Sequence, residues 1–281
     1  MSIRTRYRTG LWHPYEKPMY GVLLNPYHPL ARGLVGCWLF NEGGGNIVYD
    51  LSGHGNHGTL GGGTAGYCPA WTIGKFGSAL NFDGSDDYVD VGTDESLDVA
   101  GGDFTVAVWA RWTAATGNAR AFLNFGFSGT SNRFLLTTGF GNSGQDKVSF
   151  GYGRSTTYGA NWYYDAGSGL NDGDLHFVVA TLFGSTVTIY VDDESVSFSE
   201  GSIGVEDGNF FGLGDNDYFE GDIETILIWK RALNPDEIWQ LYTDPFCMFY
   251  HPLEAKLLYA AAPPAGIVPQ AMHHYCMLRE V

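Results

Sequence analysis

The chain has 281 residues, of which 44% are hydrophobic and 15% aromatic, which is enough to bury the core of a large domain. Acidic residues outnumber basic residues by 31 to 15 and give a net charge of −16, which argues against nucleic acid as a partner, because phosphate binding needs a basic patch. No apolar run reaches the ~20 residues of a membrane-spanning helix, and no apolar segment follows the arginines of the first ten residues. We therefore expect neither membrane insertion nor a secretory signal.

The first and last segments of the chain have an unusual composition. Residues 1–32 carry a net charge of +4 and prolines at four positions, which exclude a long helix and predict an extended arm rich in aromatic residues. Residues 244–281 predict a second arm of the same character, and the interval 33–243, with a net charge of −19, predicts the domain between them. Because a cationic arm complements an acidic body, we expect the arms to lie on a neighbouring surface, either of the same domain or of another subunit. The alternative is an acidic, soluble surface with a frayed arm.

Short strands follow one another between the two arms. Residues 104–112 alternate with period 2, with Phe104, Val106, Val108 and Trp112 on one face, which is typical of a strand. Gly184-Ser185 predicts a two-residue turn between two further strands. The remaining strands are predicted at residues 34–40, 79–82, 88–91 and 224–229. One short helix is predicted after them, because Asn234 can cap it, Pro235 fits its first turn and Glu237 completes a capping box.

Four motifs follow one another along the chain in the same order as in a known family. They are WLFNEGGG at 38–45, DLSGHGNHG at 50–58, ALNFDG at 79–84 and FEGDIE at 219–224, the last followed by KRAL at 230–233. Together they resemble the laminin-G-like, concanavalin-A-type jelly-roll family over roughly residues 33–243. The resemblance implies an all-β sandwich of two antiparallel sheets with one short helix near its C-terminus, and a fold that most often serves as a binding module.

Calcium is the cofactor that the acidic loops suggest. Hard cations need six to eight oxygen ligands, and glycine-rich turns expose backbone oxygens beside carboxylates and amides. The candidate ligands are Glu42, Asp50, Asn56, Asp83 and Asp87, and Asp86 lies in the same acidic loop as the last two. The resemblance implies a structural calcium ion near such loops. The alternative is that Asp50 and Asn56 only hydrogen-bond their own turn.

An aromatic cluster predicts a sugar-binding surface. Carbohydrate recognition places aromatic rings against the apolar face of a sugar and fixes the hydroxyls with a few polar groups. The candidate residues are Tyr158, Trp162, Tyr163, Tyr164 and Asp165, in a stretch that is also rich in Gly, Ser and Asn. The alternative is that the alternating rings of Trp162 and Tyr164 pack into the core.

A run of three carboxylates raises the question of catalysis. Glu220, Asp222 and Glu224 share one face of a strand with period 2, as in retaining β-glucanases of this broad fold. However, Glu220 and Glu224 would be ~13 Å apart at the backbone, whereas retaining hydrolysis needs carboxyl groups ~5–5.5 Å apart. Glu224 also departs from the aspartate that the laminin-G-like family has at this position. We therefore expect no enzymatic activity.

Four cysteines are spread along the chain, at positions 37, 68, 247 and 276. They form no CxxC pair, so a zinc site is not expected, and without a secretory signal reduced thiols are favoured over a disulfide.

The sequence as a whole predicts a non-catalytic, lectin-like binding module displayed on a larger assembly. Proteins with laminin-G-like domains occur on the outside of phage virions, and by this resemblance we expect a virion surface protein that binds glycans or a partner protein. The alternative is a purely structural decoration subunit whose arms bind neighbouring subunits.

Overall fold

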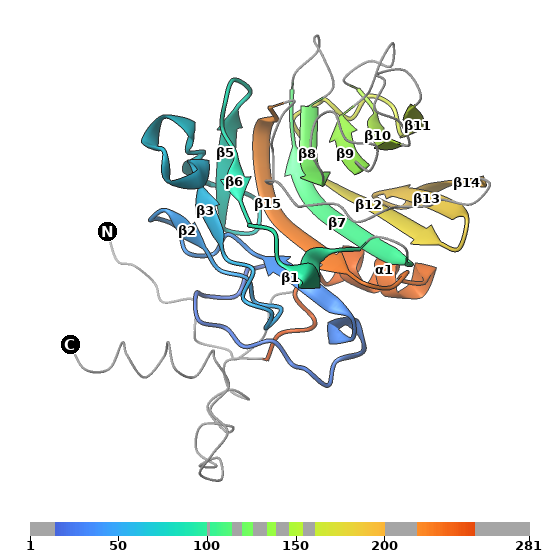
Figure 1. Ribbon diagram of the computed structural model, residues 1–281, viewed down its shortest axis with the longest axis horizontal. Coiled ribbons are helices and arrows are strands. Elements are labelled where there is room, and N and C mark those ends of the chain that lie inside the picture. Colours follow the sequence, from blue (N-terminus) through green and yellow to red (C-terminus); the bar gives the residue numbers. More distant parts are fainter. Residues whose placement is uncertain are drawn as a thin grey trace.

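The computed structural model describes residues 15–99, 102–113, 120–125, 134–138, 146–153, 161–199 and 218–250. Within these ranges, side chains are described everywhere except at positions 120, 124–125, 134–135, 152–153 and 161–163. Antiparallel strands dominate the described part and form two stacked sheets and a small third one (Figure 1).

The larger sheet has eight strands. Seven are ordered β14-β13-β12-β7-β15-β5-β4, and β1 pairs with the second half of β15 beside β5. The strands are β1 (Leu34–Trp38), β4 (Ala70–Ile73), β5 (Ser78–Asp83), β7 (Phe104–Arg111), β12 (His176–Phe183), β13 (Thr186–Val191), β14 (Glu194–Ser199) and β15 (Glu220–Trp229). The predicted two-residue turn between residues 183 and 186 is confirmed, and Gly184 adopts the positive φ of 59° that such a turn requires.

The smaller sheet has four strands in the order β11-β10-β9-β8. They are β8 (Arg120–Phe125), β9 (Phe134–Thr138), β10 (Val148–Gly153) and β11 (Asn161–Ala166). A third, short sheet joins β2 (Ile47–Val48), β3 (Gly58–Leu60) and β6 (Val89–Asp90), and four 3-10 turns occupy Pro29–Ala31, Gly61–Gly63, Ala65–Tyr67 and Glu95–Leu97.

The main core lies between the two larger sheets. Alternation on β7 directs Val106 and Val108 into it, where they share one apolar cluster with Phe122 of β8, Leu136 of β9 and Phe150 of β10. All five side chains are almost fully buried. The predicted sandwich of two antiparallel sheets is therefore confirmed.

A second core covers the opposite face of the larger sheet. The other set of β7 positions, including Trp109, packs with Phe177 of β12 and Leu227 of β15. Helix α1 (Pro235–Thr243) closes this layer with Ile238 and Leu241. The helix is the one predicted from its capping residues, and the capping box between Asn234 and Glu237 is present.

The described parts of both terminal segments complete this second core. Residues 15–32 and 244–250 contribute Leu30, Phe246 and Met248 to it, and a backbone bridge joins Leu24 to Phe249. Two hydrogen bonds flank the bridge. The Asn25 amide donates to the carbonyl of residue 248 at 2.8 Å, and the amide of residue 250 donates to the carbonyl of residue 23 at 2.9 Å. Of the two surfaces considered for the arms, the described parts lie on their own sandwich. The boundaries at residues 32 and 243 stay predictions.

Candidate functional site

The loop between β2 and β3 is held together by one buried carboxylate. Asp50 accepts hydrogen bonds from the amides of Cys37, Ser52 and Asn56 at 2.9–3.0 Å and from the Ser52 hydroxyl at 2.7 Å. The Asn56 amide group donates to the carbonyl of Val35 at 2.9 Å and to Ser96 Oγ at 2.8 Å. These contacts agree with the alternative that Asp50 and Asn56 hydrogen-bond their own turn, because both side chains are engaged without any ion. A metal role for Asp50 and Asn56 stays a prediction.

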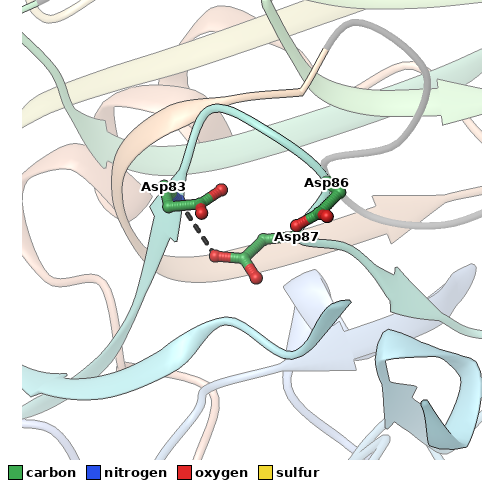
Figure 2. A group of neighbouring side chains, drawn as sticks. All are labelled: Asp83, Asp86 and Asp87. Carbon is green, nitrogen blue, oxygen red and sulfur yellow. Dashed lines mark hydrogen bonds between the residues drawn. The ribbon is translucent and has the colours of Figure 1, made fainter. Parts of the chain in front are cut away.

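The second acidic loop brings three carboxylates together (Figure 2). Ligand oxygens of Asp83, Asp86 and Asp87 all lie within 4.8 Å of one another, and among the described residues neither Glu42 nor Asp50 belongs to such a group. Asp87 Oδ2 accepts a hydrogen bond from the Asp83 amide at 2.9 Å, and this bond fixes the loop between β5 and β6. The structure thus unites two of the five predicted ligands with a neighbour.

Electrostatics at this loop favour a cation. Burial raises the pKa of the Asp87 carboxyl, the charges of Asp83 and Asp86 act in the same direction, and the hydrogen bond from the Asp83 amide opposes them. Glu220 lies directly opposite Asp83 in the pairing of β15 with β5, although its carboxylate is not one of the three grouped oxygen ligands. Three clustered carboxylates are hard oxygen ligands, so the loop could bind a metal ion.

Two tyrosines stand beside the acidic loop. The rings of Tyr67 and Tyr88 are 6.3 Å apart at an angle of 38°, and Tyr67 is 43% exposed. The Tyr88 amide donates to the Tyr67 carbonyl at 3.2 Å, which ties the turn after β3 to the start of β6. Sequence analysis missed this pair because the rings come from separate loops and no period relates them. The only signal was the glycine run at residues 61–63 that lets the loop fold back.

The predicted aromatic cluster lies partly outside the described residues. Tyr158 is among the residues not described, and Trp162 and Tyr163 lie in β11 with side chains that are likewise not described. Tyr164 is half-buried and stacks on Phe198, with ring centroids 4.4 Å apart, as in the alternative that packs it into the core.

Asp165 accepts a hydrogen bond from the Ser149 hydroxyl of β10. The sugar-binding role of the whole cluster stays a prediction.

The three carboxylates of β15 lie in three different environments. Glu220 is exposed, whereas Asp222 is paired with Arg111 at 2.5 Å and with the Asn81 amide group at 2.6 Å. Glu224 is fully buried, and its carboxylate accepts the amides of residues 75 and 76 at 2.5 and 2.9 Å. The register between β15 and β7 shifts between residues 223 and 225, so the strand bulges at Glu224 and the expected period of 2 is broken there.

A buried lysine was not singled out from the sequence. Lys17 is 8% exposed, and its ammonium group donates to the carbonyl of Ser78 and, at 2.7 Å, to that of Glu224. Burial lowers the pKa of Lys17 to about 7, while the charges of Glu224 and Glu42 oppose the shift.

Glu42 lies near this lysine and is half-buried. Its Oε1 atom accepts the Tyr49 amide at 2.7 Å, and its Oε2 atom is buried with no hydrogen-bond partner among the described residues. Burial raises the pKa of Glu42, against the hydrogen bonds from backbone amides and the charge of Lys17.

No helix in the ranges that the structure describes is long and apolar enough to cross a membrane.

Fold and site together define a class of protein, the concanavalin-A-type jelly roll, here with an acidic loop beside one exposed and one half-buried tyrosine ring. The sequence profile of the Concanavalin A-like lectin/glucanases superfamily matches residues 83–239, over half of the chain, and the protein belongs to this superfamily. No curated protein matches the chain significantly.

Several solved structures share the fold. Domain 4 of AbnA, a GH43 extracellular arabinanase from Geobacillus stearothermophilus solved in complex with arabinotriose, is similar with a TM-score of 0.53 and 19% identity, over 74% of this chain and 98% of that one. A structure of botulinum neurotoxin type C, whose cell entry depends on interaction with two ganglioside molecules, is similar with a TM-score of 0.55 and 12% identity. The match covers 76% of this chain and 52% of that one. A Trypanosoma rangeli sialidase mutant with trans-sialidase activity is similar with a TM-score of 0.53 and 14% identity, over 80% of this chain and 36% of that one. At these identities the likeness shows the fold alone.

Proposed function

We propose that this protein is a non-catalytic glycan-binding module. The observation that carries the proposal is its membership of the Concanavalin A-like lectin/glucanases superfamily. Two structures with the same fold support it, because the arabinanase domain was solved in complex with arabinotriose and the cell entry of the neurotoxin depends on interaction with two ganglioside molecules. Fold alone does not fix function, so the binding surface must be argued from its own residues.

The acidic loop and the tyrosine pair form the surface that we assign to the glycan. The exposed ring of Tyr67 offers an apolar face to a sugar, and the carboxylates of Asp83 and Asp86 offer acceptors to its hydroxyls. Calcium is the ion that we propose for the Asp83, Asp86 and Asp87 group, since carboxylate oxygens are its usual ligands. The β11 residues Trp162 and Tyr163 are proposed as a second set of rings.

A glycan array followed by calorimetry tests this function. The full chain is screened against arabino-oligosaccharides and ganglioside glycans, once with calcium and once with a chelator. We expect binding with calcium and a loss of about tenfold in affinity for Tyr67→Ala, the size of one ring contact. Tyr27→Ala is the matched control, because Tyr27 is 89% exposed in the N-terminal segment. An array without hits on calcium-loaded protein would refute the proposal.

We also propose that the protein does not hydrolyse glycans. Both oxygens of the Glu224 carboxylate accept backbone amides in a fully buried position, which suits a structural role rather than contact with a sugar. Incubation with β-glucans should release no reducing ends. Hydrolysis that Glu224→Gln abolishes would establish the opposite.

Display on a larger assembly, such as a virion surface, is a second proposal. It is favoured by the charge contrast between residues 1–32, at +4, and residues 33–243, at −19. The mass of the full chain in solution, measured by light scattering at low and high salt, tests it. A monomer at every concentration and salt, with no cross-links between copies, would argue against self-assembly of this kind.

A further inference from the structure

The ammonium group of Lys17 donates hydrogen bonds to two backbone carbonyls, those of Ser78 and Glu224. The Glu42 carboxylate and the Ser78 hydroxyl lie nearby, although neither forms a hydrogen bond or an ion pair with the ammonium group, and we call these four groups the cradle. The Glu42 loop passes close over Ser78, because a Cβ atom added at Gly43 would lie 3.6 Å from Ser78 Oγ. Two carbonyls therefore contact the buried ammonium group, and two further polar groups lie close to them, from three segments of the chain in all.

Two oxygens of the cradle have no hydrogen-bond partner among the described residues. They are Glu42 Oε2 and Ser78 Oγ, and both are buried. An unsatisfied buried acceptor costs free energy unless a cation or a water molecule compensates it. The Lys17 ammonium has three protons, of which two are engaged by carbonyls, so the lysine does not saturate the oxygens around it.

The composition of the cradle is that of a metal site. One carboxylate, one hydroxyl and two backbone carbonyls are ligands that hard cations such as Ca²⁺ and Na⁺ prefer. The second carboxylate nearby, that of Glu224, is held by amides of the 75–76 turn and supplies negative charge rather than a free oxygen.

We propose that the cradle is a cation site that the chain fills with its own ammonium group, and that it binds a free hard cation, Ca²⁺ in the first place, when the Lys17 side chain is removed. Lys17 thus acts as a tethered ion that fastens the N-terminal segment. Other contacts of this segment support the fastening. The Lys17 amide donates to the Phe76 carbonyl at 2.9 Å, the Tyr15 ring stacks on Phe76, and the Asn41 side chain donates to the Pro18 carbonyl at 3.0 Å.

The test is a rescue experiment by thermal unfolding. Lys17→Ala should lower the melting temperature by about 10 °C, because it leaves buried carboxylates without their cation. Millimolar calcium or methylammonium should restore part of the loss. Calcium should raise the melting temperature of the double variant K17A/E42Q by no more than it raises that of wild type. Wild type serves as the reference for calcium bound at the Asp83 loop. Lys75→Ala is the matched control, because Lys75 lies on the adjacent turn with its side chain exposed.

Two further measurements keep the proposal falsifiable. Lys17→Met preserves the apolar stem, so a variant as stable as wild type would reduce Lys17 to a packing residue and overturn the proposal. So would a Lys17→Ala protein that responds to calcium and methylammonium no more than wild type does. If Lys17→Ala does not fold, the ¹⁵N signal of the Lys17 amine in wild type decides. We expect a protected ammonium at mildly acidic pH, and a neutral or freely exchanging amine would contradict a tethered ion.

Discussion

Replacement of Asp50 by alanine should be among the most damaging single changes in the loop between β2 and β3. The carboxylate accepts three amides and one hydroxyl at 2.7–3.0 Å, and the residue is 6% exposed. The amides of Cys37 and Asn56 belong to buried residues and would lose their acceptor, whereas Ser52 is half-buried and can bond to water. At about 1–3 kcal/mol for each stranded buried group, Asp50→Ala should cost about 2–6 kcal/mol of unfolding free energy.

Urea unfolding followed by tryptophan fluorescence measures this loss. Asp90→Ala is a suitable control, because Asp90 is exposed and accepts a single amide, from Gly92 at 2.9 Å, so its removal should cost less than about 1 kcal/mol. The whole series is repeated with calcium and with a chelator. A loss below about 1 kcal/mol for Asp50→Ala would refute the hydrogen-bond argument. A large loss seen only in the presence of calcium would instead establish Asp50 as a metal ligand.

Two further predictions concern a histidine and a glycine. Hydrogen bonding to Asp192 raises the pKa of His176 against the effect of burial, with Asp172 contributing further, so the stabilisation is complete below the ordinary histidine pKa and is lost as the pH rises through the raised value. Urea midpoints measured from mildly acidic to alkaline pH should fall for wild type, and a slope that persists in His176→Gln would assign it to another group. Gly62 has a φ of 55°, and an added Cβ would lie 2.5 Å from the Tyr88 hydroxyl. Gly62→Ala should therefore cost about 1–3 kcal/mol of unfolding free energy and weaken glycan binding. Unchanged stability and affinity would show that the loop adapts.

The sandwich could be predicted from the sequence because its signals are local. Alternation along residues 104–112, the Gly184-Ser185 turn and the capping box at Asn234 each need only a few adjacent residues, and all three are present in the structure. The motifs that resemble the laminin-G-like family added the arrangement of the sheets, which no local pattern contains.

The candidate site was predicted only in part, because its contacts join distant segments. Asp83 and Asp87 were found since they share one short loop. The pairing of Tyr67 with Tyr88 and the insertion of Lys17 beside Ser78 depend on how loops fold back, which composition and period do not encode. The prediction that Glu220 and Glu224 share one face of a strand was wrong for a related reason. One extra residue in a bulge reverses the direction of every later side chain in the strand.

The backbone bridge between Leu24 and Phe249 also governs how the molecule responds to a pulling force. Residues 23 and 250, which are hydrogen-bonded to each other, lie on the same side of the bridge. Tension applied to these two residues therefore breaks the hydrogen bonds of the antiparallel pair one after another. The long ladders between β7, β12 and β15 lie outside this path and are not sheared. A tethered molecule would therefore yield first at its chain ends, shedding the cover of the second core while the sandwich stays intact.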